Sequence, residues 1–405
     1  MNSADTVFIL LSSALVMFMT PGLALFYGGL TRSKNVLGTI MHSFIALGVV
    51  TLIWVLWGYT LAFGTDIGGI IGGLDFFGLS GVGQEPNPDL AGNLPHLIFM
   101  IFQCMFAIIT VALISGAYAE RMKFSAFLLF TVLWSTLVYS PLCHWVWGGG
   151  WMGSMGALDF AGGAVVHMSS GSAALAAAVV LGPRNGFGQR AFIPHNLPMT
   201  ITGAAILWFG WFGFNAGSAL AADGLAANAF VTTHIAAAMA ALGWLLLEWL
   251  HRGQPTTLGA ASGAVAGLVA ITPAAGFVGP LSSIILGLVA GMVCYGGVLL
   301  KERLGYDDSL DVVGIHGLGG IWGALATGLF ASTAVNSGGA DGLFFGNPAQ
   351  VGIQLISILA TCIFVFAASY IILKVVDAVI GLRVSPEEEE QGLDLSQHSE
   401  TGYQL

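Results

Sequence analysis

The sequence predicts an all-α polytopic membrane protein with eleven transmembrane helices. Three observations predict this class: an apolar composition, repeated charge-free runs long enough to span a bilayer, and basic residues confined to alternate loops. Of the 405 residues, 56% are hydrophobic and only 8% are charged, and the mean hydropathy is +0.86. A soluble domain of this length needs more polar surface than this composition supplies. The chain is therefore expected to lie in a lipid bilayer.

Each predicted span is close to the ~20 residues that a helix needs to cross a bilayer. The spans are 6–28, 37–62, 94–117, 124–141, 162–182, 198–217, 225–250, 257–273, 281–300, 311–332 and 348–379. Pro273 and the segment 276–280 divide one long charge-free run into two helices joined by a short turn. The N-terminus lacks the basic segment and cleavage pattern of a signal peptide, so the first span is expected to be retained.

The positions of the basic residues test the predicted set of spans, because Lys and Arg accumulate in short cytoplasmic loops. All eleven basic residues follow odd-numbered spans or lie at the inner end of the last one, and the loops on the opposite side contain acidic residues but neither Lys nor Arg. The basic residues are Arg32, Lys34, Arg121, Lys123, Arg184, Arg190, Arg252, Lys301, Arg303, Lys374 and Arg383. A missed span would have mixed the two kinds of loop. The pattern therefore predicts an outer N-terminus and an inner C-terminus.

The acidic run Glu387–Glu390 carries much of the net charge of −10. We expect residues 1–383 to form the membrane domain and residues 384–405 to form a solvated cytoplasmic tail, either disordered or docked. The four cysteines lack paired spacing and are expected to serve in packing. Because no activated Ser or Cys motif and no HExxH spacing appears, the sequence does not favour an enzyme. No cofactor, metal site or nucleic-acid partner is expected.

Two histidines lie inside apolar runs in matching contexts. His167 follows Asp159 by eight residues, and His316 follows Asp308 by eight residues and Asp311 by five. A titratable side chain in hydrocarbon costs free energy unless it faces a partner or a cavity, so both histidines are candidates for a functional site. They lie on spans five and ten. This predicts an inverted five-helix repeat, spans 1–5 and 6–10, with the two imidazoles meeting near the membrane midplane and a long last helix outside the repeat.

A packed structural role is the alternative for each histidine taken alone. His234 is a third intramembrane histidine without a twin, and it is expected to be structural, at a helix or subunit contact. His144 lies at the outer end of a span and is expected to be interfacial.

Aromatic side chains and a hydroxyl gather on the predicted outer side of these histidines. Trp145 and Trp147 precede three glycines, Phe102–Phe106 lies on span three, and Trp211–Ser218 lies at the end of span six. Ring faces with one hydrogen-bonding group and no nearby Lys or Arg suit a small cation. Taken alone, a Trp near a membrane interface is usually an anchor and a Phe in a span is usually a packing residue. If these aromatic side chains and the hydroxyl lie together in the folded protein, a cation site is favoured over separate packing roles.

Several long stretches together resemble the ammonium transporter family, the Amt/MEP/Rh group, in its bacterial Amt branch. The resemblance covers essentially the whole chain. The stretches are FMTPGLALFYGGLTRSKNVL (18–37), FQCMFAIITVALISGAYAERMKFSA (102–126), HWVWGGG (144–150), GALDFAGGAVVH (156–167), PHNLPM (194–199), GWFGFNAGS (210–218), LGAASGAVAGLV (258–269), DVVGIHGLGGIWG (311–323) and GLRVSPEEEEQGLD (381–394).

The resemblance implies a role for each candidate residue. It implies that Trp147, Phe106 and Ser218 form an outer ammonium recruitment site, and that Asp159 supports this site by ordering the backbone near it. It implies that Phe106 and Phe214 form a phenyl gate, that His167 and His316 form an imidazole pair in a hydrophobic pore, and that Trp211 lines this pore. It also implies a homotrimer in the cell (inner) membrane, ammonium or methylammonium as substrate, and regulation by a trimeric PII-type signal protein. Near the end of the tail, Ser399 stands where the family usually has glycine.

Removing a proton from the cation lowers the free-energy cost of crossing such a pore. Moving a bare cation into a low-dielectric lumen costs of order 20 kcal/mol in the idealised limit, and one aromatic contact offsets only ~2 kcal/mol. Transferring a proton from an amine cation of pKa ~10 to an imidazole costs roughly 5 kcal/mol. We therefore expect NH4+ to lose a proton and cross as NH3. The proton either follows along the histidines or stays outside. A sensor that binds ammonium and signals to a cytoplasmic partner is the alternative function.

Overall fold

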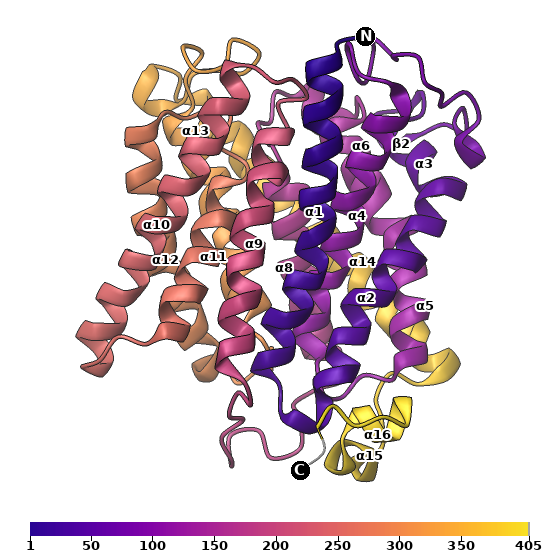
Figure 1. The fold of residues 1–405 in the computed structure, drawn as a ribbon, viewed down its shortest axis with the longest axis vertical. Helices are drawn as coiled ribbons and strands as arrows, with labels where there is room; N and C mark the ends of the chain where they lie inside the picture. The colour runs from indigo at the N-terminus through magenta and orange to yellow at the C-terminus, as the bar shows by residue number, and fades with distance from the viewer. Residues whose placement is uncertain (404–405) are drawn as a thin grey trace.

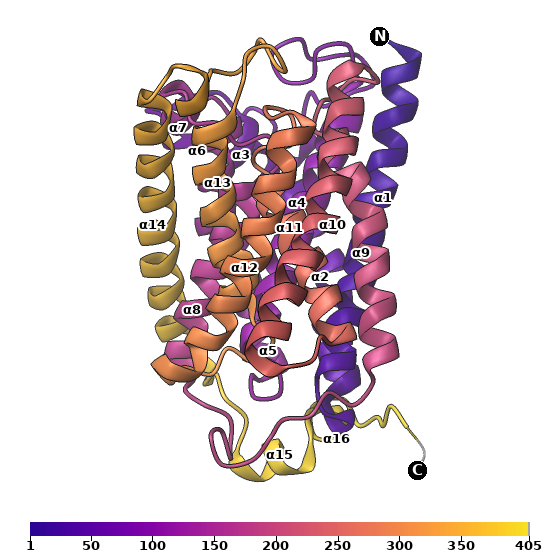
Figure 2. The same ribbon diagram turned by 90° about the vertical axis from the view of Figure 1, so that its left-hand side faces the viewer.

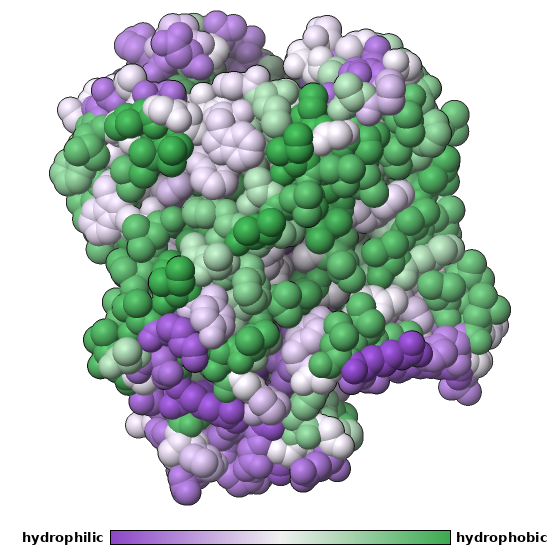
Figure 3. Space-filling model, turned by 180° about the vertical axis from the view of Figure 1, so that it is seen from behind, coloured by the Kyte–Doolittle hydropathy of each residue, from purple (hydrophilic) through white to green (hydrophobic). Residues whose placement is uncertain are grey.

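A computed structural model describes residues 1–403. The described chain forms a bundle of long helices that run between two ends, with the N-terminus at one end and helices α15 and α16 at the other (Figure 1). On the face shown in Figure 3, apolar residues cover the middle of the bundle and polar residues gather at both ends. This is the surface expected of a protein embedded in a bilayer.

The long helices alternate with short connecting elements. The long units are α1 (Ser3–Leu30), α2–η2–α3 (Val36–Ile53, Trp54–Gly58, Tyr59–Phe63), α4 (His96–Tyr118), α5–η4–α6 (Phe124–Trp134, Ser135–Tyr139, Ser140–Trp147), η5–α8 (Gly163–Met168, Ser169–Leu181), α9 (Leu197–Gly217), α10 (Gly224–Arg252), α11 (Thr257–Ile271), α12 (Pro280–Leu304), η6–α13 (Val313–Gly317, Leu318–Phe330) and α14 (Ala349–Ile380). The short elements are η1 (Ser33–Asn35), the antiparallel pair β1 (Asp66–Ile67) and β2 (Ile71–Gly72), η3 (Phe77–Leu79), α7 (Trp151–Ser154), η7 (Leu343–Phe345), α15 (Pro386–Gln391) and α16 (Leu393–His398).

Ten of these helical units in residues 1–403 are long and apolar enough to cross a membrane. The predicted span 257–273 forms α11, an apolar helix of fifteen residues that is shorter than the others. The count of eleven spans therefore stays a prediction. The predicted span 124–141 ended too early, because the helix continues through a π-helical turn to Trp147. Pro141 lies at the start of α6, directly after this turn, and does not end the helix.

Helices α1 and α9 pack closely along their length through glycines. A Cβ atom added to Gly203 would lie 2.3 Å from the backbone nitrogen of Phe26, and one added to Gly210 would lie 2.3 Å from Cγ of Met19. Small residues let membrane helices approach until their backbones touch. These two helices form one edge of the bundle, opposite α14 (Figure 2).

The helices that carry His167 and His316 cross at the centre of the bundle. A Cβ atom on Gly171 would lie 2.3 Å from Cα of Gly317, and one on Gly320 would lie 3.0 Å from the backbone nitrogen of Met168. The contact is reciprocal, because in each half the residue four after the histidine meets the residue one after the other histidine. Both histidines also lie in π-helical segments, η5 and η6. Such segments are frequent at functional sites.

Ion pairs tie several loops together at the end of the bundle where the tail lies. Glu120 accepts hydrogen bonds from Arg32 and Arg184, and Arg184 also pairs with Asp307 at 2.8 Å. Burial raises the pKa of Glu120, but the two paired guanidinium groups outweigh burial and hold that pKa below its usual range. The basic residues that follow spans one and five therefore lie at the same end, as their segregation in the sequence requires.

The tail folds against this end of the bundle as far as Tyr403. Ser385 and Glu388 form a capping box that starts α15. The carboxylate of Asp394 accepts hydrogen bonds from the backbone N–H groups of Leu37 (3.0 Å) and Gly38 (2.8 Å), which lie in the first turn of α2. The sequence left disorder and docking open for the tail, and the described part of it is docked.

Candidate functional site

A cavity of about 320 Å³ opens at the end of the bundle opposite the tail. Phe106, Trp147 and Ser218 lie together in its wall. The ring of Trp147 stands edge-on to that of Phe106, with ring centroids 6.0 Å apart. The Ser218 hydroxyl donates to the backbone carbonyl of Phe214 at 2.8 Å, which fixes its oxygen at the end of α9. The cavity thus presents ring faces and one hydroxyl together.

Two phenyl rings close the inner end of this cavity. The ring centroids of Phe106 and Phe214 are 4.3 Å apart, and both side chains are buried. Phe106 lines the outer cavity, whereas Phe214 lines the lumen beyond it. A solute can pass from one space to the other only if these rings move.

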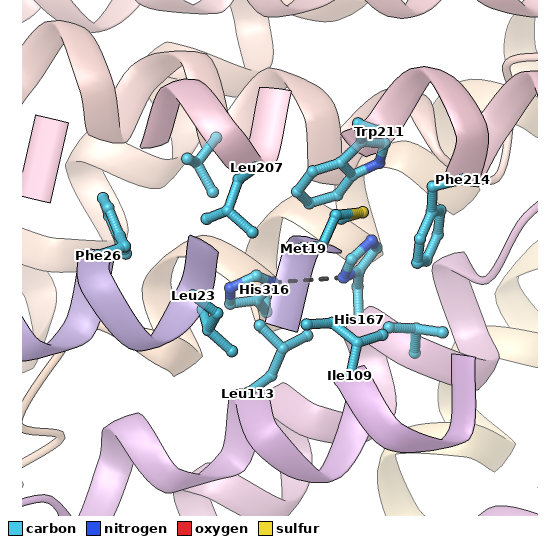
Figure 4. A pocket seen from close by; sticks show the side chains of 12 residues that line it. Met19, Leu23, Phe26, Ile109, Leu113, His167, Leu207, Trp211, Phe214 and His316 are labelled. Carbon is cyan, nitrogen blue, oxygen red and sulfur yellow. Dashed lines mark hydrogen bonds between the residues drawn. The ribbon is translucent and has the colours of Figure 1, made fainter. Parts of the chain in front are cut away.

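The lumen behind the rings is narrow and apolar (Figure 4). It encloses about 10 Å³, roughly the space of one water molecule. Its lining consists of Met19, Leu23, Phe26, Ile109, Leu113, Val166, His167, Leu207, Trp211, Phe214, Val265 and His316. A hydrated cation does not fit into this volume, so an ion would have to lose its water before it entered.

The two histidines face each other inside the lumen (Figure 4). Their Nδ1 atoms are 3.3 Å apart, and their rings are stacked with centroids 5.3 Å apart. The indole of Trp211 also stacks on His167, with ring centroids 5.5 Å apart, and is itself fixed by a 2.9 Å hydrogen bond from Nε1 to Thr272. Within residues 1–403, Nε2 of His167 has no hydrogen-bond partner. This nitrogen is therefore free to bond to a solute, and it accepts when the proton of the ring is on Nδ1.

Asp159 orders the entrance to the helix that carries His167. Its carboxylate accepts hydrogen bonds from four consecutive backbone N–H groups, those of Gly162 (2.8 Å), Gly163 (2.6 Å), Ala164 (2.7 Å) and Val165 (3.3 Å). Burial raises the pKa of Asp159, although these four N–H groups act in the opposite direction.

The backbone of Asp159 serves the outer cavity as well. Its carbonyl accepts a 2.9 Å hydrogen bond from Nε1 of Trp147. Gly162 has a φ of +120°, a conformation that favours glycine, and this lets the chain turn beneath the carboxylate. Asp159 therefore connects the indole of the outer cavity to the start of η5.

Asp308 has the corresponding place before His316. Its Oδ2 accepts from the backbone N–H of Val313 at 2.7 Å, the same spacing of five residues as from Asp159 to Ala164. Asp311, the other carboxylate that the sequence offered, forms an ion pair with Lys301 instead. Of the two upstream carboxylates, Asp308 is therefore the structural counterpart of Asp159.

Two further histidines that the sequence singled out, His234 and His144, lie away from the lumen. His234 is exposed on the outer surface of α10, where its ring packs at a tilt against Trp208, with centroids 5.5 Å apart. His144 is buried near the outer end, where its ring nitrogens meet the carbonyl of Ala62 and the carboxylate of Asp66, each at 2.9 Å.

Sequence reasoning missed two glutamines near the start of α14. Gln350 and Gln354 are each 1% exposed. The Gln354 amide accepts from the N–H of Leu158 (2.8 Å) and donates to the carbonyl of the same residue (2.9 Å), directly before Asp159. Two amides four residues apart in an otherwise apolar span were the available signal, because buried amides in a membrane helix need partners.

The chain is similar to known proteins over its whole length. A sequence model described as the Ammonium Transporter Family matches residues 7–403. The ammonium transporter of Bacillus subtilis is 57% identical over 405 residues, covering 100% of this chain and 99% of the relative. Ammonium transporter Amt1 of Archaeoglobus fulgidus is 50% identical and is covered completely.

Solved structures have the same fold. Mep2 of Saccharomyces cerevisiae superimposes with a TM-score of 0.90 at 38% identity, covering 96% of this chain and 88% of that one. A protein titled "Sensor Amt Protein" gives a TM-score of 0.89 at 29% identity, with 98% of both chains covered. With the family match across residues 7–403 and these relatives, the chain belongs to the ammonium transporter family.

Proposed function

We propose that this protein conducts ammonium through its own lumen by taking up NH4+ at the outer cavity and passing it inward as NH3. One observation carries the proposal: an aromatic cavity with a fixed hydroxyl leads through two stacked phenyl rings into a lumen of about 10 Å³ that holds a histidine pair. The two curated relatives named ammonium transporters, at 57% and 50% identity, support ammonium as the substrate.

Each residue takes a distinct part in the proposed path. Trp147 and Phe106 offer ring faces to the cation, and the oxygen of Ser218 accepts one of its hydrogen bonds. Asp159 holds Trp147 and the start of η5 without touching the ion. Phe106 and Phe214 block hydrated ions, so only a solute that has lost its water passes between the rings.

The histidine pair and Trp211 shape the inner part of the path. Neutral imidazole accepts a hydrogen bond from NH3 at one nitrogen, and the apolar lining disfavours a charge. A proton released at the phenyl rings either passes along His167 and His316 or returns outside. The first route moves charge across the membrane and the second does not.

We propose the family architecture for the chain: eleven spans including α11, an outer N-terminus and an inner tail. The reciprocal glycine contacts between the helices of His167 and His316 support an inverted repeat of spans 1–5 and 6–10. The segregation of all eleven basic residues supports the orientation in a cell (inner) membrane.

We also propose a homotrimer and a PII-type partner at the tail. His234 supports the trimer, because an imidazole on the outer surface of a span is costly in lipid but not at a subunit contact. The docked tail supports a partner that competes for its binding surface. Mass measurement of the detergent-solubilised protein tests the trimer, and affinity capture with a purified PII-type protein tests the partner.

Charge movement tests the proposed transport. Purified protein in liposomes on a solid-supported membrane is pulsed with ammonium and compared with His167→Ala and His316→Ala. We expect a transient current that both variants lose, which supports the proton route along the histidines. An absent current with internal alkalinisation would indicate net NH3 conduction. Silence in both assays with tight ammonium binding would overturn transport in favour of the sensor.

A further inference from the structure

Helix α14 lies at the edge of the bundle, yet its first turns carry buried amides (Figure 2). Further along, this helix exposes apolar side chains such as Leu359 (59%) and Ile363 (67%), as a lipid-facing helix does. Gln350 and Gln354, at 1% exposure each, lie on the opposite side of the helix. Burying an amide without hydrogen-bond partners costs free energy in an apolar surrounding. The partners of these two side chains therefore indicate what their burial serves.

The amide of Gln354 holds one residue of the outer loop from both sides. Its Oε1 accepts from the N–H of Leu158, and its Nε2 donates to the carbonyl of Leu158 and, at 3.1 Å, to the carbonyl of Ala324. Gln350 adds a 3.0 Å bond from its Nε2 to the carbonyl of Gly156. The pairing resembles a strand contact made by a side chain, and it fixes both the position and the rotation of the peptide units around Leu158.

The residue held in this way directly precedes Asp159. A shift of Leu158 would move the carbonyl that accepts from Trp147 and the carboxylate that holds the start of η5. On the far side, the N–H of Phe160 bonds to the carbonyl of Pro273 at 3.1 Å. The segment between these two anchors is therefore short, and Gln354 is one of its two fixed ends.

The same amide also joins the two halves of the bundle. Leu158 precedes the helix of His167, whereas Ala324 lies on α13, which continues from the segment of His316. Close packing accompanies this bond, because a Cβ atom on Gly328 would lie 3.1 Å from Cγ of Gln354. One side chain from the last helix thus connects both histidine-bearing helices.

We infer that Gln354, supported by Gln350, is a positioning residue for the outer cation site and that it acts through Leu158, Asp159 and Trp147. It touches neither the cavity nor the lumen lining. The inference rests on the proposed function for its transport consequence, but the positioning itself is a property of the fold. The last helix, which lies outside the proposed repeat, then holds the recruitment site in place.

The test compares Gln354→Met with the parent in ammonium uptake by liposomes. Methionine keeps the length of the side chain and removes the hydrogen bonds that the Gln354 amide makes to Leu158, Ala324 and Gln350. Because small displacements of a positioned group weaken its interactions, we expect KM for ammonium to rise roughly tenfold while the maximal rate changes little. In a Trp147→Leu background, Gln354→Met should raise KM no further. An unchanged KM, or an equal rise in both backgrounds, would overturn the inference.

Hydrogen exchange gives a readout that needs no transport. In Gln354→Met, the backbone amides of residues 158–165 should exchange faster than in the parent. The backbone amides in the C-terminal half of α14 should exchange at the parent rate. Ser369→Ala is the matched control, because it removes the buried bond that Trp134 donates to α14 far from the outer loop. If Gln354→Met does not accumulate as folded protein, Gln350→Met, which removes the bond to Gly156, replaces it in both assays. If Gln354→Met exchanges faster at residues 158–165 but the parent itself does not transport ammonium, only the proposed function is rejected. Unchanged exchange in Gln354→Met would reject the positioning role.

Discussion

The Nδ1 atoms of His167 and His316 lie 3.3 Å apart inside an apolar lumen. At this distance one nitrogen must donate and the other accept, so the two rings share a single proton between these atoms. The proton on one ring therefore sets the tautomer of the other. The two imidazoles form one functional unit.

The first prediction concerns this unit. His167→Ala, His316→Ala and the double variant should lose the ammonium-evoked current to the same degree, because residues that act together are not additive. Current measurement on a solid-supported membrane checks it. His251→Ala is the control, because His251 bonds to Tyr295 near the end of α10, away from the lumen, and should keep the parent current. A double variant with a much deeper loss than either single variant would contradict the shared-proton interpretation.

The second prediction concerns the phenyl rings. Phe214→Ala removes one of the two rings that separate the outer cavity from the lumen. An apolar constriction excludes water by its width, so osmotic water permeability of liposomes should rise roughly tenfold in the variant. Stopped-flow light scattering measures this rate.

The control for the ring comes from the same helix. Phe212 stacks on Phe230 with centroids 4.0 Å apart and does not line the lumen. Phe212→Ala should leave water permeability at the parent value. Equal permeability in both variants would show that Phe214 does not limit access to the lumen.

The third prediction concerns the carboxylate of Asp159. Asp159→Asn replaces one accepting oxygen with an NH2 group, so two N–H groups lose their acceptor, either those of Gly162 and Gly163 or those of Ala164 and Val165. Leaving buried donors unpaired costs about 1–3 kcal/mol each, so the variant should unfold at a lower temperature and show a higher KM for ammonium. Thermal unfolding and uptake, measured on the same preparation, check both. Parent-like stability with a raised KM would instead indicate direct contact between Asp159 and the ion.

The sequence predicts the helices well, because hydropathy reports the same property that the bilayer selects. Predicted spans such as 94–117 and 225–250 differ from α4 and α10 by at most two residues at either end. The histidine pair was predictable too, because a carboxylate precedes each histidine by eight residues, Asp159 before His167 and Asp308 before His316. The predicted end of the span 124–141 was wrong, because the helix continues past Pro141 to Trp147. The sequence does not reveal the π-helical turn that precedes this proline.

Contacts between distant segments were beyond the sequence. Gln354 bonds to Leu158 across 196 residues, and no local pattern in either segment indicates that pairing. The choice between Asp308 and Asp311 likewise depended on where Lys301 lies. Aromatic residues such as Trp147 were ambiguous between anchor and site, and their convergence around one cavity became visible only in three dimensions.

The fourth prediction concerns the docked tail. Asp394→Ala removes the acceptor for the N–H groups of Leu37 and Gly38. Loss of such a cap costs about 0.5–2 kcal/mol, so limited proteolysis should cleave the tail several-fold faster in the variant. Glu400→Ala, which changes an exposed tail carboxylate, is the control and should be cleaved at the parent rate. Identical cleavage of all three proteins would show that Asp394 does not hold the tail.

The fifth prediction is a pH dependence of stability that originates at Asp308. This carboxyl group is fully buried, and burial raises its pKa to about 6, with Lys301 opposing the shift and Asp311 adding to it. Tyr27 on the packed face of α1, Tyr306 and Arg121 are further titratable side chains that interact with this carboxyl group. In the unfolded chain the same group titrates near ~3.9.

The sign of the effect follows from proton binding. Between pH ~4 and about 6, the folded protein holds a proton on Asp308 that the unfolded chain has lost, so the free energy of unfolding falls as the pH rises through this window. Asp308→Asn cannot titrate. Its unfolding temperature should therefore increase relative to the parent as the pH rises from 4 to 6, and the difference should stay constant above about pH 7. Thermal unfolding in detergent across this range measures it, with Asp341→Asn as a control on an exposed loop. A difference between Asp308→Asn and parent that is flat in pH would mean that Asp308 titrates at its ordinary value in the folded protein, and its burial would then need a compensating charge beyond Lys301.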